Sequence, residues 1–455
     1  MKSCGAPLDI LIKGGKLLTL SPEKEIWDNP LIGIRDGRVI FIEEAHAPLA
    51  SLYNPAETID ATGCLVLPGL VNTHTHVPMV CFRGLADDLP LMEWLEDHIF
   101  PVERKYIRRE TVRAGALLGI AEMILSGTTT FCDGYFYEST IAGAAREAGI
   151  RCVAGMGIFD ADIGKVTPEE IAGHVRAAEK FLGKWADGGS MLIPALFCHA
   201  PYTCSPETIR SVKETARRHG APFLIHVAET ATEKDIIMKL YGNGPVAHLA
   251  SLGVLDERTV AIHCNWLDNE DIHCLASKGV KVSHNPQSNM KLATGIGPIP
   301  ALLAAGVDVG LGTDGCASNN DHDMFGEMDT AAKLHKVFHL DPSLLDARKV
   351  LQMATRDGAK VLGLDDIIGS IAVGKAADII VVETAKPHLT PMYNPYSHLV
   401  YAASGADVRT SIINGRLVMK DRRLLTIDQE AAMDAVEAIA AEILQDTPTL
   451  ARRKK

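Results

Sequence analysis

The sequence predicts an α/β fold: a (β/α)8 TIM barrel with a small β-sandwich built from both ends of the chain. Three observations lead to this prediction. Strand-like and helical stretches alternate through the centre, both ends contain short strands and tight turns, and 455 residues suit one large barrel with a smaller partner. We expect residues 1–63 and 369–455 to form the sandwich with a C-terminal helix, and residues 64–368 to form the barrel.

The N-terminal segment alternates apolar and polar side chains, as half-buried strands do. Residues 9–20 surround the pair Gly14-Gly15, and residues 31–43 surround Asp36-Gly37. The second pair indicates a hairpin, because Asp-Gly accepts the positive φ angles of a tight two-residue turn.

The centre of the chain contains eight apolar runs, with helical stretches between several of them. Eight strands that alternate with helices suit a closed barrel. The runs are 64–72, 128–133, 151–159, 191–199, 222–227, 260–264, 280–284 and 307–313.

The C-terminal segment resembles the N-terminal one. Residues 377–383 form one predicted strand, and residues 410–420 form a hairpin with Asn414-Gly415 at its tip. Residues 428–445 carry apolar side chains at helical spacing and predict a helix packed by one face. Neither end has enough strands for a stable sheet alone, so we expect the two ends to pair.

The composition limits partners and compartment. Lys and Arg number 45 against 57 Asp and Glu, a net charge of −12, and we therefore expect no nucleic-acid partner. The apolar runs are too short for a membrane-spanning helix, and residues 1–15 lack an apolar run with a small-residue cleavage site. The ten cysteines are scattered without a C-x-x-C pair, which favours a reducing environment. We expect a cytoplasmic protein without a membrane partner, and the sequence leaves a homo-oligomer open.

Polar residues with metal-binding side chains gather at the C-terminal ends of four runs. His74 and His76 follow the first run, His226 lies in the fifth, His263 in the sixth, and Asp314 follows the eighth. A lone strand histidine is usually structural, but these positions occur together in barrel order, at the ends where barrel active sites lie. Three imidazoles and a carboxylate suit Zn²⁺ or a similar divalent ion.

Several longer motifs carry a resemblance to a known family. Over nearly the whole chain, the sequence resembles the amidohydrolase superfamily, in particular its deaminase and chlorohydrolase branch and the 5-methylthioadenosine/S-adenosylhomocysteine deaminases within it. The motifs are PGLVNTHTH (68–76), HAPYTCS (199–205), HVAET (226–230), HCNWL (263–267), SHNPQSNMKLATG (283–295), LGTDGCASNN (311–320) and GSIAVGKAADIIV (369–381).

The resemblance implies the metal ligands His74, His76, His226 and Asp314. Members with two metals commonly use a carboxylated lysine from the fourth strand, and the fourth run here has none, supplying His199 instead. We therefore expect one divalent metal ion per chain, most simply Zn²⁺.

Hydrolytic deamination, the reaction that the resemblance implies, needs three roles besides metal binding. Asp314 is placed to accept the proton of the attacking water, and Glu229 to protonate the ring nitrogen and the leaving ammonia. His263 fits a group that orients the water and stabilises the adduct.

The resemblance also implies substrate contacts. Glu103 is expected to hold the ribose hydroxyls, His199 to touch the substrate, and Trp94 to wall the pocket, with Glu229 and Asp314 also in contact with substrate. His284 is either a supporting residue behind the site or merely structural.

We therefore expect a hydrolytic deaminase of adenosine-type nucleosides that releases ammonia and the inosine analogue. Deaminases of this kind that accept S-adenosylhomocysteine can carry arginines near the end of the third strand, which meet the amino-acid carboxylate of the substrate. Residues 154–164 here contain no arginine, Met156 is expected to face that region, and Arg151 lies at the other end of the strand. This predicts that 5′-methylthioadenosine, 5′-deoxyadenosine and adenosine outpace S-adenosylhomocysteine. The alternatives are a hydrolase of another amino- or chloro-substituted N-heteroaromatic, of guanine or s-triazine type, and a non-catalytic relative.

Overall fold

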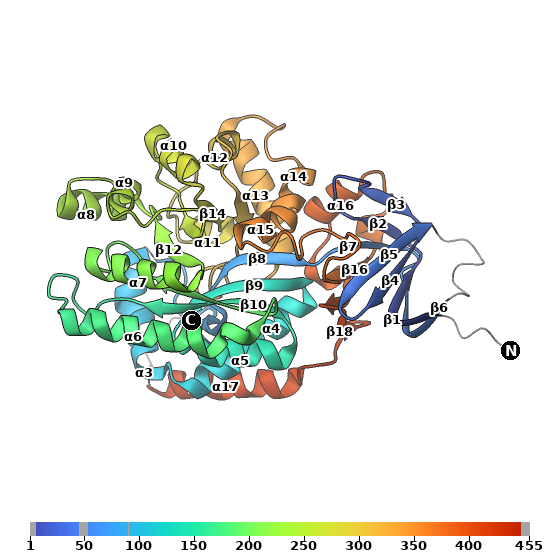
Figure 1. The fold of residues 1–455 in the computed structure, drawn as a ribbon, viewed down its shortest axis with the longest axis horizontal. Helices are drawn as coiled ribbons and strands as arrows, with labels where there is room; N and C mark the ends of the chain where they lie inside the picture. The colour runs from blue at the N-terminus through green and yellow to red at the C-terminus, as the bar shows by residue number, and fades with distance from the viewer. Residues whose placement is uncertain (1–5, 45–52, 90, 447–455) are drawn as a thin grey trace.

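Eight parallel strands form the barrel in the computed structural model, which describes residues 6–44, 53–89 and 91–446 (Figure 1). The strands follow one another in chain order around the sheet, so the predicted barrel is confirmed. They are β8 (Leu70–Thr75), β9 (Thr128–Tyr135), β10 (Arg151–Ile158), β11 (Leu192–Cys198), β12 (Phe223–Val227), β13 (Thr259–His263), β14 (Lys281–His284) and β15 (Val309–Leu311).

The barrel closes between its first and last strands. The Asp314 backbone N–H donates to the His74 carbonyl at 2.9 Å, and a bridge pairs Thr75 with Asp314. The Asn72 side chain supports this seam from within, because its amide donates to the Thr313 hydroxyl at 2.7 Å and its oxygen accepts the Thr313 N–H at 3.0 Å. The seam therefore places metal-binding side chains from both ends of the sheet beside each other.

Helices surround the strands, which explains why the strands read as nearly continuous apolar runs. All eight residues of β9 are buried. The principal helices are α4 (Arg109–Leu125), α5 (Glu138–Ala148), α6 (Pro168–Trp185), α7 (Pro206–His219), α8 (Ala231–Tyr241), α9 (Pro245–Ser251), α10 (Asn269–Lys278), α13 (Met324–His339), α14 (Ala347–Met353) and α15 (Arg356–Val361).

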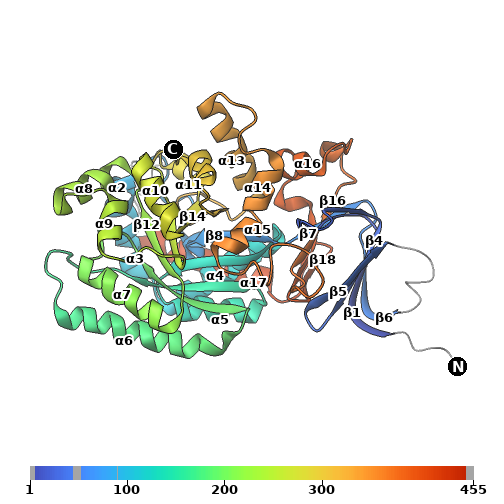
Figure 2. The same ribbon diagram turned by 45° about the horizontal axis from the view of Figure 1, so that its top comes forward.

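Two further sheets lie beside the barrel, as the N-terminal strands in Figure 2 show. One contains strands from the N-terminal segment alone, in the order β5 (Arg38–Glu44), β4 (Pro30–Arg35), β1 (Ala6–Lys13) and β6 (Tyr53–Asp60). The other mixes both ends of the chain, in the order β19 (Arg423–Leu424), β18 (Arg416–Lys420), β17 (Val408–Ile413), β16 (Ile379–Glu383), β7 (Cys64–Pro68), β2 (Lys16–Leu18) and β3 (Ile26–Asp28). The expected pairing between the two chain ends is therefore present.

The two sheets share one apolar core and have the predicted turns. Ile12, Ile32 and Ile34 of one sheet belong to the same buried cluster as Val66, Val381 and Ile412 of the other. Asp36 and Gly37 have φ angles of 50° and 77°, and Asn414 and Gly415 have 48° and 72°, so both hairpins turn as their sequences predict.

The first predicted barrel strand differs from the structure, because the run 64–72 divides at Gly69. The part before Gly69 is β7, which pairs with β2 and β16 of the mixed sheet, and the part after it is β8 of the barrel. A Cβ atom at Gly69 would lie 2.1 Å from the Thr129 side chain, so any other residue here would have to displace Thr129. The division into residues 1–63 with 369–455 and 64–368 stays a prediction, with β7 now among the sandwich strands.

The C-terminal helix α17 (Gln429–Asp446) packs along α4, as Figure 1 shows. Val436 and Ile443 are buried on its inner face, and Arg108 forms an ion pair with Glu442 at 2.7 Å. A helix packed by one face was predicted here.

Short helices cover the end of the barrel where the strands finish. They follow β8 along the chain and precede α4. They are η1 (Val77–Phe82), α2 (Leu91–Glu93), η2 (Trp94–Ile99) and α3 (Phe100–Tyr106).

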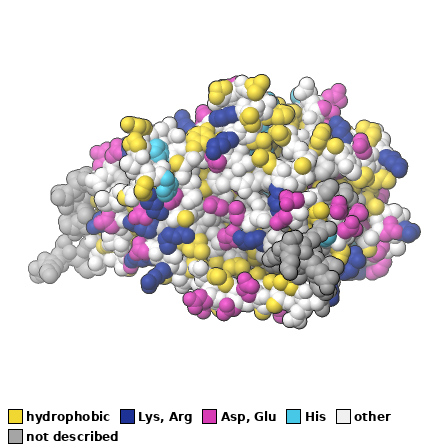
Figure 3. Space-filling view, turned by 180° about the vertical axis from the view of Figure 1, so that it is seen from behind, with side chains coloured by type: hydrophobic (Ala, Val, Ile, Leu, Met, Phe, Trp, Pro, Cys, Tyr) yellow, Lys and Arg dark blue, Asp and Glu magenta, His cyan; other side chains and the backbone are white. Residues whose placement is uncertain are grey.

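The outer surface mixes charges of both signs. On the face that Figure 3 shows, acidic and basic side chains are interspersed. Among the described helices, none is both long and apolar enough to cross a bilayer.

Candidate metal centre and active site

The four predicted metal ligands and His263 converge at the C-terminal ends of the barrel strands. Nε2 of His74 and Nε2 of His76 each lie 3.4 Å from Oδ1 of Asp314. His226 and His263 complete the group from β12 and β13. The ligand atoms of His74, His76 and Asp314 lie within 4.8 Å of one another, as do those of His74, His226 and His263.

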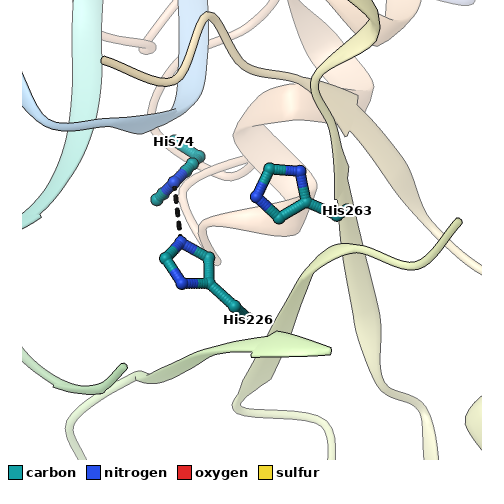
Figure 4. A group of neighbouring side chains, drawn as sticks. All are labelled: His74, His226 and His263. Atoms are coloured by element: carbon teal, nitrogen blue, oxygen red, sulfur yellow. Dashed lines mark hydrogen bonds between the residues drawn. The ribbon is translucent and has the colours of Figure 1, made fainter. Parts of the chain in front are cut away.

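Figure 4 shows the second of these groups, with three imidazole rings turned toward one point. Nε2 of His226 lies 3.2 Å from Nε2 of His74. His263 also approaches the carboxylates, because its Nε2 lies 3.8 Å from Oε2 of Glu229 and 4.0 Å from Oδ2 of Asp314.

The protonation states suit a divalent cation. Burial lowers the pKa of His74 to about 4 and the pKa of His226 well below its ordinary value, so both rings are neutral at pH 7. Burial also acts to raise the pKa of Asp314, but its bond with His74 and the nearby histidines outweigh burial and hold that pKa well below the usual range. Neutral nitrogens beside an ionised carboxylate are the donors that Zn²⁺ binds.

Neighbouring groups fix the orientation of two of these side chains. Nδ1 of His76 donates to the Gly134 carbonyl at 2.7 Å, which leaves its Nε2 lone pair facing Asp314 and the cluster. Ser288 Oγ donates to Oδ2 of Asp314 at 2.7 Å, and the Gly315 N–H donates to Oδ1 at 2.8 Å. Such outer contacts are typical of preorganised metal sites.

His263 is held by an amide chain. Its Nδ1 lies 2.8 Å from Oδ1 of Asn289, and the Asn289 amide donates to Oδ1 of Asn265 at 2.9 Å. Because Asn289 presents its oxygen, Nδ1 of His263 carries hydrogen and Nε2 faces the site. The φ angle of His263 is 72°, an unusual value for a non-glycine residue at a functional strand end.

A cavity of about 770 Å³ opens over this group of histidines and Asp314. The predicted substrate residues Trp94, Glu103, His199 and Glu229 all line it, together with Asp314. Its size is in the range of small-molecule sites. The structure therefore brings every predicted site residue to one place.

Glu103 lies in α3 and is buried beside Tyr135, whose hydroxyl donates to the carboxylate. Burial raises the pKa of Glu103 to about 7, partly offset by this hydrogen bond. A buried carboxylate with one fixed donor retains acceptor capacity for a ligand in the cavity.

His199 follows β11 and presents one nitrogen to the cavity. Its Nδ1 bonds to Oγ1 of Thr203 at 2.8 Å, and the Thr203 hydroxyl itself donates to the Ala200 carbonyl. Burial lowers the pKa of His199 to about 3, so the ring is neutral and its Nε2 is an acceptor.

One sequence expectation changes here, and one that was left open is narrowed. Met156 does not line the cavity; Gly157 and Phe159 line it instead. His284 lies outside the cavity lining and bonds to Nε2 of His335 at 3.1 Å, which favours a structural role.

The sequence did not predict two aromatic residues of the cavity wall or one arginine beside them. Tyr135 and Phe197 line the cavity from strand ends, and Arg104 lines it from α3, directly after Glu103. The sequence prediction considered an arginine on the third strand, and there Arg151 is bonded to Asp378 at the far end of the strand. The adjacency of Arg104 to Glu103 was the signal that could have revealed it.

The fold and the donor set together define a barrel hydrolase that uses a divalent metal ion. Comparison with known proteins gives the family: the sequence profile of the Amidohydrolase family matches residues 65–418, and the chain belongs to this family, as predicted.

Three similar proteins add detail. A 5-methylthioadenosine/S-adenosylhomocysteine deaminase of Syntrophobacter fumaroxidans is 49% identical over 96% of this chain and 98% of its own. A 5′-deoxyadenosine deaminase of Methanothermobacter thermautotrophicus is 48% identical over 90% and 96%. The crystal structure of an adenosine deaminase from Xanthomonas campestris with bound zinc has a TM-score of 0.92 and 36% identity, covering 97% of this chain and 100% of that chain.

Proposed function

We propose that this protein is a zinc-dependent hydrolytic deaminase of adenosine-type nucleosides. The observation that carries the proposal is one cavity that contains a metal donor set, the carboxyl of Glu229 and the carboxyl of Glu103. The relatives described above are named as deaminases of such nucleosides, which agrees with this prediction.

In this reaction the oxygen of a water molecule replaces the amino group on the purine ring, and ammonia leaves. We propose that His74, His76, His226 and Asp314 hold one divalent ion. When bound, such an ion supplies Lewis acidity that lowers the pKa of water from 15.7 to roughly 7–9.

The chain's own residues move the protons. Asp314 is ionised, because its pKa is held well below the usual range, and it accepts a proton from the attacking water. Burial raises the pKa of Glu229, so this carboxyl holds a proton more readily than usual. Glu229 gives its proton to the ring nitrogen beside the attacked carbon, takes up the hydroxyl proton of the adduct as the carbonyl forms, and passes that proton to the leaving amine. The proton held by Asp314 then returns to Glu229, which restores both groups. His263 orients the water and stabilises the adduct.

The substrate assignment rests on the other side of the cavity. Glu103 accepts hydrogen bonds from the two ribose hydroxyls, His199 offers an acceptor nitrogen, and Trp94 forms part of the wall. We keep the ranking of 5′-methylthioadenosine, 5′-deoxyadenosine and adenosine above S-adenosylhomocysteine, because a free carboxylate is costly to desolvate in a mostly apolar pocket. Arg104, at the cavity lining, is the group that works against this ranking.

The alternative is a hydrolase of another aromatic amine or halide, such as guanine or a chloro-triazine. Glu229 favours an amine, because a leaving amine needs a proton and a halide does not. Ammonia release across adenosine, 5′-deoxyadenosine, 5′-methylthioadenosine, S-adenosylhomocysteine, guanine and a chloro-triazine separates the two. We expect turnover of the nucleosides, and turnover of guanine or the triazine alone contradicts the proposal.

The partner of this protein is a small-molecule nucleoside. The sequence predictions on location and other partners stay predictions. They are a cytoplasmic location, no nucleic-acid or membrane partner, and a homo-oligomer left open.

A further inference from the structure

The turn that carries Glu229 has an unusual backbone. It lies between the end of β12 at Val227 and the start of α8 at Ala231. Within it, Ala228 has a φ angle of 52°, in the left-handed region that non-glycine residues rarely adopt. A conformation of this kind persists only where surrounding contacts hold it.

Glu233 supplies two of these contacts. Its Oε1 accepts the Ala228 N–H at 2.8 Å, and its Oε2 accepts the Glu229 N–H at 2.8 Å. The side chain is buried, with 2% of its surface exposed. One carboxylate thus receives two successive amides, the second from the proposed acid–base residue itself.

The carbonyl groups of the same turn bond to residues that directly follow β13. The Ala228 carbonyl accepts the N–H groups of Asn265 and Trp266, each at 3.0 Å, and the Glu229 carbonyl accepts the Asn265 side-chain amide at 3.0 Å. The backbone N–H and carbonyl groups of Ala228 and Glu229 are thus all hydrogen-bonded. These bonds fix the backbone at Glu229, and the place of its carboxyl then depends on the side-chain torsions.

Glu233 has a second, ordinary contact that offers a competing explanation. Its backbone N–H donates to Oγ1 of Thr230, the N-cap of α8, at 3.0 Å. Its carboxyl group also lies in the first turn of the helix, where negative charge is favourable, while burial raises the pKa of this group to about 8. Stabilising α8 alone would account for a carboxylate at this position, so the two roles must be separated by experiment.

We propose that Glu233 is a positioning residue that fixes the backbone of Glu229 and so aims its carboxyl at the reaction site. The aim is visible in the 3.8 Å between Oε2 of Glu229 and Nε2 of His263. This inference rests on the proposed deaminase function and adds the residue through which Glu229 is placed.

Glu233→Gln is the sharpest single change. Glutamine keeps the shape but replaces one acceptor oxygen by an NH₂ group, which faces a backbone N–H donor and cannot bond to it. One of the two amide contacts is lost, and Glu229 becomes free to shift. Since a misplacement of about 1 Å can cost roughly 10²-fold in rate, we expect kcat to fall by about 10–100-fold.

A double-mutant cycle with Glu229→Gln tests whether the effect passes through Glu229. If Glu233 acts by positioning that carboxyl, Glu233→Gln lowers kcat in the wild type but changes it less than about threefold in the Glu229→Gln background, because coupled residues are non-additive. A purely structural role lowers kcat by the same factor in both backgrounds, and that result overturns the inference.

A second readout uses the leaving group. A 6-chloropurine riboside needs the proton on its ring nitrogen but none on its leaving group, so one of the two proton transfers by Glu229 is absent. Glu233→Gln is therefore expected to reduce turnover of this substrate less than that of the 6-amino nucleoside. A larger loss on the chloro substrate than on the amino substrate contradicts the positioning role. Thr230→Ala is the matched control, since it removes the N-cap of the same helix and leaves both carboxylate contacts in place. A loss of kcat with Thr230→Ala as large as with Glu233→Gln assigns the effect to α8 instead.

Zinc content and the folded fraction are measured for every variant. If Glu233→Gln does not fold, the cycle is run with Glu233→Asp, which keeps both acceptor oxygens on a shorter arm. A wild-type protein that deaminates no nucleoside contradicts the proposed function, whereas active wild type with additive variants contradicts only the role of Glu233.

Discussion

The two ends of the barrel both bury charged side chains but treat them differently. At the N-terminal end of β10, Arg151 forms two bonds to Asp378, at 3.1 and 3.0 Å, and both side chains are almost fully buried. Lys213 is likewise bonded to Asp256 at 2.6 Å and to Thr259 at 2.9 Å. Both of these buried cations have a fixed partner of opposite sign.

At the C-terminal end the buried carboxylate of Asp314 has no such partner among the described residues. Among the described residues that contact Asp314, none is a lysine or arginine; its neighbours are histidines, a serine hydroxyl and a backbone N–H. This carboxylate and the neighbouring imidazoles are suited to a bound divalent cation. In this barrel, charged residues at the N-terminal end therefore stabilise the fold, whereas those at the C-terminal end serve the reaction.

Removing the metal tests the C-terminal end most severely. We expect dialysis against a chelator to remove one divalent ion per chain and to abolish ammonia release, with activity restored by Zn²⁺. Elemental analysis before and after dialysis gives the stoichiometry. Two tightly held ions per chain, or full activity after dialysis, contradict a mononuclear site.

Glu229→Gln tests the same end with the metal in place. The amide keeps the shape of the side chain but cannot transfer a proton, and loss of a general acid–base group costs about 10²–10⁴-fold in rate. Because Glu229 is proposed to act twice in each cycle, we expect a loss at or above the top of that range. Zinc content is expected to stay unchanged, and near-normal turnover removes the proton-shuttle role.

Arg151→Met tests the N-terminal end. It leaves Asp378 buried without its cation, and breaking such a pair costs about 3–5 kcal/mol. We expect the free energy of unfolding in urea to fall by this amount while kcat per folded molecule stays the same. Arg113→Met is the matched control, because its pair with Glu147 is half exposed and worth less than about 1 kcal/mol. Equal effects of the two changes would remove the contrast between the barrel ends.

Glu103→Gln tests the substrate side of the cavity. Hydrogen bonds to a charged group contribute about 1.5–3 kcal/mol, so kcat/KM for nucleosides is expected to fall by roughly 10–150-fold. Substrates without a ribose should be nearly unaffected. Since the pKa of Glu103 is about 7, its carboxylate becomes protonated as the pH falls through 7, and kcat/KM of the wild type should decline with it. Glu103→Gln has no such group to protonate, so its kcat/KM should not show this decline.

Arg104→Gln is expected to have the smallest effect. This exposed side chain lines the cavity, where exposed charge pairs contribute about 0.2–1 kcal/mol. We expect kcat/KM for S-adenosylhomocysteine to fall by up to about fivefold relative to 5′-methylthioadenosine. An unchanged ratio shows that Arg104 does not meet the amino-acid carboxylate.

The sequence predicted the barrel and the metal cluster because both depend on strand ends that meet in a fixed order. His74, His226 and Asp314 are far apart along the chain, but each follows an apolar run, and barrel topology brings run ends together. The split at Gly69 was not predictable from hydrophobicity, because β7 and β8 are both buried and read as one run.

Features set by side-chain geometry also escaped sequence reasoning. Arg104 lines the cavity because of the course of the short helices after β8, which periodicity does not specify. The two bonds from Glu233 depend on the left-handed turn at Ala228, a conformation that alanine itself does not indicate.

The closing seam has a consequence for the order of events during synthesis. Asn72 and Thr313 are 241 positions apart, so at about 5–20 residues per second the last strand leaves the ribosome roughly 12–48 seconds after the first. Until then β8 has an open edge, and His74 and His76 lack Asp314. We therefore expect complete metal loading to follow translation of the eighth strand, and a nascent chain halted before residue 309 to expose an unpaired strand that needs chaperone protection.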